Sequence, residues 1–231
     1  MDSVKKEFTK HAKDYNNYNI IQQIVSKALV RELDFIPKRI LELGCGSGQI
    51  FKNIKFNFEY YKAIDFSQTM CNLHPKGKNI DIVCLDFDSK KFAENISNDK
   101  PYDIVLSSSA LQWSKNLSNI IRIISKKAPF ISVVLFTSNT FKTIFTLTNT
   151  CSPILTLEEI KTAFNKYYNC TYEVLQYNLE FENKKYLFDY IKNSGVSGGH
   201  KLSFKDAKKL YKEYNLPYLE FEVIFIKGKI K

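Results

Sequence analysis

Residues 39–48 read RILELGCGSG, an apolar run that ends in an acid and then in alternating glycines. Ile40, Leu41 and Leu43 suit a parallel strand that is covered on both faces. Glycines after such a strand let the backbone turn sharply and approach a ligand where a Cβ atom would collide. We interpret the stretch as a buried strand that runs into a nucleotide-binding turn. A three-glycine turn can also be only a tight loop, so the strands that follow must decide.

The spacing of these glycines differs from that of dinucleotide-binding proteins. Their fingerprint requires a third glycine at position 49, where this chain has Gln49. The pattern acid-x-Gly-x-Gly-x-Gly after a strand instead resembles the first motif of the class I S-adenosylmethionine-dependent methyltransferases.

The composition fits one α/β domain with a small lid, because 231 residues, 44% of them hydrophobic, can bury a sizeable core. The formal net charge of +10 favours an acidic partner, although a base-composition bias would also spread lysines along such a chain. Five cysteines without a C-x-x-C pair and three scattered histidines predict neither a metal site nor disulfides. No apolar run approaches the roughly 18 residues of a membrane span, so we expect a soluble cytoplasmic protein.

Two later predicted strands also end in an acid. The first ends at Asp65, about twenty residues past the first glycine, where a carboxylate can accept hydrogen bonds from a ribose diol. Phe66 could then lie against an adenine, while the alternative for Asp65 is a helix cap. The second strand ends at Asp86, which can accept from the adenine amino group while Phe87 supplies an apolar wall. The alternative for Asp86 is an ordinary loop acid.

A fourth predicted strand, 101–106, opens into the segment SSSALQW at 107–113. Open α/β sheets bind ligands outside the carboxyl ends of their strands, and this segment lies at such an end. Trp113, the one tryptophan, therefore lines a cleft or belongs to the core.

The remaining patterns complete the predicted order of elements. We expect helices over 3–15, 20–33 and 116–126, a helix opening at Thr156 with Glu159 as its capping partner, and helices over 186–193 and after Ser203. Further strands are expected over 131–136, around 175–181 and over 218–227.

Taken together, the chain resembles the malonyl-acyl carrier protein O-methyltransferases of biotin synthesis, a family of class I methyltransferases. The resemblance covers nearly the whole chain. It rests on Phe8-x-x-x-Ala12-x-x-Tyr15, Asp65-Phe66-Ser67-x-x-Met70, Ser108-x-Ala110-Leu111-Gln112-Trp113-x-x-Asn116-Leu117, Ser138 to Phe145, Lys192-Asn193-Ser194-Gly195-Val196, Leu210-Tyr211-x-x-Tyr214 and Tyr218-x-x-Phe221-Glu222-Val223-Ile224.

This resemblance implies a Rossmann-like α/β fold: a mostly parallel seven-stranded sheet with an antiparallel last strand, helices on both faces and a small helical lid. We expect a single methyltransferase domain over 1–231. Its parts would be an N-terminal helical cap (1–36), a cofactor-binding core (37–137), the lid with the sixth strand (138–200), and the last helix and strand (201–231).

The implied reaction transfers a methyl group from S-adenosylmethionine to the free carboxylate of malonyl on acyl carrier protein. The product, a malonyl methyl ester, would prime pimeloyl synthesis for biotin. The cofactor site would hold methionine at the glycine backbone and its ammonium near the acid, the ribose at the second strand and the adenine at the third. The residues assigned to it are Glu42, Gly44, Cys45, Gly46, Gly48, Asp65, Phe66, Asp86, Phe87, Ser107 and Ser108.

For the acceptor we expect positioning by Tyr15, Gln112 and Trp113 without a general base, since a carboxylate is already ionised at neutral pH. A basic helix face, Lys205, Lys208, Lys209 and Lys212, is a candidate docking patch for the acidic carrier protein, or a plain solvated face. Malonyl coenzyme A is a second possible acceptor. We expect a monomer that binds neither nucleic acid nor membrane.

The alternatives that remain are a methyltransferase acting on a soluble small carboxylate or a quinone-like metabolite, an RNA-binding methyltransferase, and a cofactor-binding regulator without activity. The sequence has no separate basic domain or Arg-rich stretch that would favour RNA.

Overall fold

The computed structural model describes residues 19–193 and 204–231. The predicted helix over 3–15, with Tyr15, and the predicted cap Ser203 lie outside the described residues.

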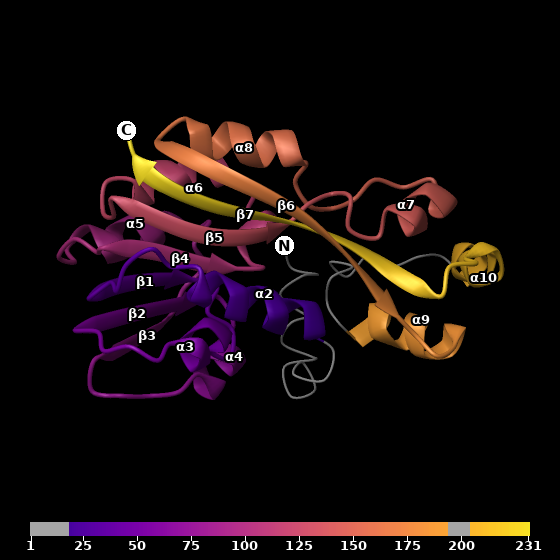
Figure 1. Ribbon diagram of the computed structural model, residues 1–231, viewed down its shortest axis with the longest axis horizontal. Helices are drawn as coiled ribbons and strands as arrows, with labels where there is room; N and C mark the ends of the chain where they lie inside the picture. Colours follow the sequence, from indigo (N-terminus) through magenta and orange to yellow (C-terminus); the bar gives the residue numbers. More distant parts are fainter. Residues whose placement is uncertain (1–18, 194–203) are drawn as a thin grey trace.

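A single seven-stranded sheet forms the centre of the molecule, with the strand order β3-β2-β1-β4-β5-β7-β6 (Figure 1). Neighbouring strands from β3 to β5 are parallel, and β7 runs antiparallel to both β5 and β6. The predicted mostly parallel sheet with an antiparallel last strand is therefore confirmed. The strands are β1 (Arg39–Leu43), β2 (Tyr60–Asp65), β3 (Ile80–Cys84), β4 (Ile104–Ser108), β5 (Phe130–Phe136), β6 (Tyr168–Glu180) and β7 (Tyr218–Ile230).

Helices cover both faces of this sheet. The helices are α2 (Ile20–Arg31), α3 (Gln49–Asn53), α4 (Gln68–Leu73), α5 (Lys90–Ser97), the short 3-10 turn η2 (Leu111–Trp113), α6 (Leu117–Ile124), α7 (Lys142–Thr148), α8 (Leu157–Asn165), α9 (Lys184–Asn193) and α10 (Phe204–Glu213). One core cluster joins the sheet to α2, α3, α9 and α10, and a second joins it to α5, α6 and α8. The alternation of apolar side chains along the strands supplies both clusters.

Local capping signals fix several helix starts. Asn116 caps α6 by accepting from the backbone N–H of Asn119, and Thr156 and Glu159 form the predicted capping box of α8. The sequence reasoning missed α7, whose threonine-rich segment has no such cap. Its N-cap residue is Phe141, which adopts a left-handed φ of 59° and is buried against Phe221.

The lid lies at the carboxyl ends of the parallel strands. The last pair of β5 with β7 joins Phe136 to Val223, whereas the β6–β7 pairing continues through five more β7 residues, back to Tyr218. This free part of the two-stranded ribbon projects beyond β5 and carries α9 and α10, with α7 beside it (Figure 1). Because the glycine turn follows β1, a parallel strand, it lies at the same end of the sheet.

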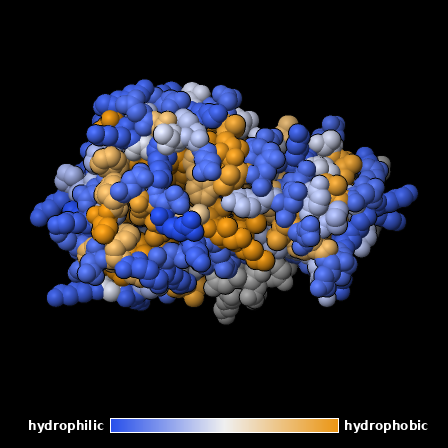
Figure 2. Space-filling model, in the orientation of Figure 1, coloured by the Kyte–Doolittle hydropathy of each residue, from blue (hydrophilic) through white to orange (hydrophobic). Residues whose placement is uncertain are grey.

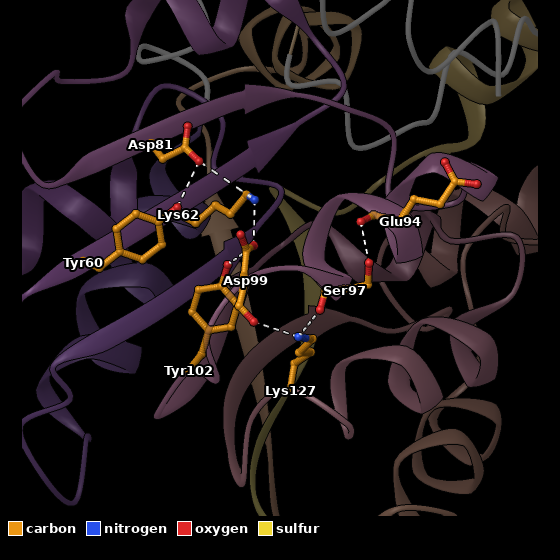
Figure 3. Close-up of polar contacts among 8 residues, drawn as sticks. All are labelled: Tyr60, Lys62, Asp81, Glu94, Ser97, Asp99, Tyr102 and Lys127. Atoms are coloured by element: carbon orange, nitrogen blue, oxygen red, sulfur yellow. Dashed lines mark hydrogen bonds and ion pairs between the residues drawn. The ribbon is translucent and has the colours of Figure 1, made fainter.

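A polar network that joins β2, β3 and the loop after α5 has no part in the predicted site (Figure 3). The ammonium of Lys62 is almost fully buried and lies 2.7 Å from the carboxylate of Asp99 and 3.9 Å from that of Asp81. The hydroxyls of Tyr102 and Tyr60 donate to Asp99 and Asp81, respectively. This buried lysine therefore ties the loop after α5 to β2, the second strand from the edge of the sheet.

The surface around α2 is partly apolar, as Figure 2 shows for the face in view. Ile20 and Ile24 of α2 are each 45% exposed, whereas Ile21, Val25 and Leu29 of the same helix are buried. Among the described residues, no helix has the length and apolar character to cross a membrane.

Candidate functional site

The glycine turn is held to β2 by Asp65. One carboxylate oxygen accepts from the backbone N–H of Gly46 at 2.9 Å, and the other accepts from that of Ser67 at 2.8 Å. Burial is the largest influence on the Asp65 carboxyl and raises its pKa to about 6, against these two hydrogen bonds. Each oxygen retains a further acceptor position. Asp65 therefore organises the turn, and the ribose contact stays a prediction.

The space available for a side chain differs among the three glycines of the turn. A Cβ atom on Gly44 would stand 2.1 Å from Cβ of Ala110, and one on Gly48 would stand 2.7 Å from the ring of Pro75. Among the described residues, a Cβ atom on Gly46 would meet nothing within 4 Å. All three have positive φ values, which glycine adopts without strain. The sequence reasoning gave one explanation for all three, but the space open to a ligand lies at Gly46, while packing of the protein itself excludes side chains from the other two.

Glu42, predicted beside the methionine ammonium, is 1% exposed and faces two buried side chains. The hydroxyl of Tyr61 donates to its carboxylate at 2.5 Å, and Nε2 of His74 lies 3.9 Å from the same oxygen. The other ring nitrogen of His74 lies 2.8 Å from the carbonyl of Pro75. Burial is the main reason that the pKa of Tyr61 is raised, followed by the charge of Glu42. Sequence reasoning missed His74, which packs its ring against the glycine turn.

The predicted adenine residues follow β3. Phe87 is buried, and its ring lies 3.9 Å from the Cβ position of Gly44, so the end of β3 reaches the glycine turn. Asp86 accepts from the backbone N–H of Asp88 at 2.9 Å and is half-buried, as is Phe66. Asp88, which the sequence reasoning did not single out, joins this loop to the segment after η2.

The serines that end β4 complete the same edge of the sheet. The hydroxyl of Ser107 donates to the carbonyl of Leu43 at 2.7 Å and so ties β4 to β1. Ser109 adopts a left-handed φ of 57°, an uncommon conformation for a residue with a side chain. Within the described part of the chain, the buried hydroxyls of Ser47, Ser108 and Ser109 have no hydrogen-bond partner. Unpaired buried hydroxyls and open space beside Gly46 fit a polar ligand at this edge.

The predicted acceptor residues lie next to these serines. Gln112 is 2% exposed, and its amide nitrogen donates to the carbonyl of Ser109 at 2.8 Å, which fixes its side chain. Trp113 is half-buried and packs against the core cluster that includes α2 and α9. Ala110 of the same segment contacts Gly44 of the glycine turn, whereas Gln112 lies against Ser109 and Trp113 against the core, and Tyr15 lies outside the described residues.

The predicted docking lysines lie on α10 of the lid. Lys208, Lys209 and Lys212 are exposed, and Lys209 lies 3.9 Å from Glu213. The side chain of Lys205 lies outside the described part. In that part no group of three His, Cys, Asp or Glu side chains could hold a metal ion.

Two grooves lie elsewhere on the described surface, beside the end of α2, with volumes of about 210 and 290 Å³. Both are lined by Ser132 near the start of β5 and by Thr171 near the start of β6. They therefore lie toward the amino ends of the parallel strands, away from the glycine turn.

Comparison with known proteins shows what this chain resembles. Residues 41–127 match the family model described as a methyltransferase domain. The YcgJ protein from Bacillus subtilis superposes with a TM-score of 0.65 at 12% identity, over 90% of this chain and 98% of that one. The chain has the class I methyltransferase fold. The plantazolicin methyltransferase BpumL, solved in complex with SAH, also has this fold, with a TM-score of 0.54 at 14% identity over 96% and 93% of the two chains.

Curated relatives of this methyltransferase carry a more specific name. A protein named malonyl-[acyl-carrier protein] O-methyltransferase from Priestia megaterium is 28% identical over 144 residues, 58% of this chain and 50% of the relative. Proteins with the same name from Legionella pneumophila and from Buchnera aphidicola subsp. Baizongia pistaciae are 24% and 27% identical, over 61% and 51% of this chain and 52% and 47% of their own lengths. The chain thus spans about half the length of the curated relatives that it matches.

Proposed function

We propose that this methyltransferase transfers a methyl group from S-adenosylmethionine to the free carboxylate of a malonyl thioester on acyl carrier protein, and so supplies a malonyl methyl ester for biotin synthesis. The observation that carries the proposal is the shared name of its curated relatives, at 24–28% identity over more than half of the chain. The segment Ala110 to Trp113, placed beside the glycine turn, supports it.

The methyltransferase domain and the neighbours solved with SAH indicate S-adenosylmethionine as the cofactor. In the proposed arrangement the backbone at Gly46 lies beside the methionine part of the cofactor, where the protein leaves open space. Asp65 would bind the ribose through its remaining acceptor positions, and Phe87 would form the wall of the adenine pocket. Glu42 would act through its charge at the turn, since its carboxylate faces Tyr61.

The chemistry requires a methyl donor and a nucleophile in line with it, and the sulfonium group of the cofactor supplies the electrophilic methyl. A malonyl carboxylate is ionised at neutral pH, so an oxygen can form the new C–O bond while the methyl–sulfur bond breaks and the neutral thioether leaves. No residue needs to remove a proton. The protein contributes positioning and exclusion of water, which can supply on the order of 7–11 kcal/mol.

Three side chains are proposed to position the acceptor. Gln112 has a fixed orientation because its amide already donates to Ser109, and a second N–H remains for the malonyl carboxylate. Trp113 would flank the methyl donor from the lid side, and Tyr15 would donate its hydroxyl. If Gln112→Ala and Tyr15→Phe both kept the wild-type kcat/KM on malonyl carrier protein, this assignment would be abandoned.

The carrier protein is proposed to dock on the exposed lysines of α10. Carrier proteins are acidic, and Lys208 and Lys212 belong to a lid that stands at the same end of the sheet as the glycine turn. Reversing both charges should raise KM strongly at low salt and little at high salt, because screening weakens exposed charge pairs. A KM that is unchanged at low salt would remove the patch.

The experiment that tests the function offers the protein labelled S-adenosylmethionine with one of four acceptors: malonyl carrier protein, malonyl coenzyme A, free malonate, or RNA. We expect base-labile label on the malonyl carrier protein. Transfer to malonate alone or to RNA alone would replace the proposal with one of the other methyltransferase activities. Binding of the cofactor without transfer to any acceptor would favour a regulator.

A further inference from the structure

Three of the five cysteines meet beside the glycine turn. Cys45 lies within the turn, Cys71 in α4 and Cys84 at the end of β3. The thiol of Cys71 is close enough to the thiols of both Cys45 and Cys84 to interact with them. Cys45 and Cys71 are buried, whereas Cys84 is exposed. The array therefore has one end open to solvent and the other inside the predicted cofactor site.

Cys71 and Cys84, two neighbouring members of the array, bracket the end of β2. The sulfur of Cys71 lies 3.6 Å from the carbonyl oxygen of Asp65, and the sulfur of Cys84 lies 3.5 Å from that of Phe66. In the sheet, Cys84 is also the register partner of Asp65. The Cys71 thiol thus contacts the backbone of Asp65, which holds the glycine turn, and the Cys84 thiol contacts the backbone of the next residue.

We propose that Cys71 and Cys84 form a redox-sensitive thiol pair that reacts with a low-molecular-weight disulfide, and that their oxidation blocks the cofactor site. Cys84 is the member that such a molecule can reach. Its thiolate attacks one sulfur of the external disulfide, forms a mixed disulfide and releases the first thiolate. The Cys71 thiolate then attacks the sulfur of Cys84, forms the internal disulfide and releases the second thiolate. Two protein thiols are oxidised and one external disulfide is reduced to two thiols.

The surroundings of Cys71 suit the second step. Its pKa is lowered, chiefly by the hydrogen bond from Cys45 and against the effect of burial. A larger thiolate fraction favours attack on the mixed disulfide. The pKa of Cys45 is raised, first by its hydrogen bond with Cys71 and then by burial, so Cys45 supports the pair as a donor.

A chain of contacts connects this disulfide to the turn. The bond requires a sulfur–sulfur distance of about 2.05 Å, so α4 must move toward the end of β3. Ser67 begins α4: its hydroxyl accepts from Met70, and its backbone N–H donates to Asp65. Displacement of α4 therefore displaces the carboxylate that holds Gly46. This consequence rests on the proposed cofactor role of the turn, whereas the pairing of the thiols does not.

The test treats the full chain with oxidised glutathione and maps its cysteine peptides by mass spectrometry. We expect a cross-linked pair of peptides containing Cys71 and Cys84, lighter by two hydrogens and restored by dithiothreitol. Cys84→Ser should abolish it, and Cys151→Ser, which changes another exposed cysteine, should leave it unchanged. A stable glutathione adduct on Cys84 without the internal bond, or a bond that includes Cys45, would overturn the assignment.

Calorimetric titration with SAH measures the consequence for the cofactor site. Oxidation should raise the Kd by about tenfold or more, equivalent to at least 1.4 kcal/mol, and reduction should restore it. Cys84→Ser should bind SAH equally before and after treatment. An unchanged Kd in the fully cross-linked protein would overturn the proposed block. If the reduced wild type does not bind SAH, the proposed function fails instead, and the peptide map still decides the thiol pairing.

Discussion

Replacing two glycines of the same turn should separate packing from ligand binding. In Gly44→Ala the added methyl would stand 2.1 Å from Cβ of Ala110, whereas carbon atoms prefer about 3.5–4.0 Å. The end of β4 or the turn must therefore move. Overpacking costs about 1–3 kcal/mol, and the left-handed φ of 72° adds about 1–2 kcal/mol for a residue with a Cβ atom. We expect the free energy of unfolding to fall by about 2–5 kcal/mol.

Gly46→Ala has the same conformational cost without the collision. Its φ is 52°, and no described residue lies within 4 Å of the added methyl, so we expect a loss of about 1–2 kcal/mol. The methyl enters the space assigned to the cofactor, so the affinity for SAH should fall by about tenfold or more in protein that is still folded.

Urea denaturation gives the two stabilities, and calorimetric titration with SAH gives the affinity. A common m-value would show that the midpoints report stability alone. Equal destabilisation by the two substitutions would contradict the packing argument. Wild-type SAH affinity in folded Gly46→Ala would contradict the placement of the cofactor.

Three further predictions concern stability, each measured by urea denaturation. Lys62→Ala should lower the free energy of unfolding by about 3 kcal/mol, because it leaves the mostly buried carboxylate of Asp99 without its ion-pair partner. Lys38→Ala breaks an exposed ion pair and should cost less than about 1 kcal/mol. Equal costs would show that the buried network contributes no more than a surface pair. Burial raises the pKa of Asp65 from 3.8 to about 6, so between these pH values the folded state binds more protons than the unfolded state. The stability of the wild type relative to Asp65→Asn should therefore fall by roughly 3 kcal/mol as the pH rises from about 4 to about 6. A stability difference that does not change with pH would refute the shift. Thr156→Ala removes the capping box of α8 and should cost about 1 kcal/mol, with Glu158→Ala, outside the box, as the control that should cost less.

Periodicity and capping predicted much of the fold. The glycine turn, the strand ends at Asp65 and near Asp86, and the capping box at Thr156 are local signals, and the strands and helix that they predict are present with small changes of boundary. The prediction missed α7, because its N-cap residue, Phe141, is held by contact with the distant Phe221 and not by a local capping hydrogen bond.

The candidate site was predicted less completely. Sequence reasoning brought the right segments to one edge of the sheet, since the carboxyl ends of parallel strands meet there. It could not give the partners of each side chain. His74 beside Glu42, and Asp88 hydrogen-bonded to Ser114, depend on contacts between segments that are distant in sequence.

The sequence by itself determined that a strand and a glycine turn begin an α/β sheet, because glycine freedom and apolar runs are properties of single residues and their neighbours. Only the tertiary structure decided what each glycine is for. Gly44 and Gly48 are crowded by Ala110 and Pro75, residues that chain folding brings to the turn, whereas no described residue lies within 4 Å of a Cβ position on Gly46. The difference lies in steric exclusion between distant segments, which is set when the sheet and its helices pack together.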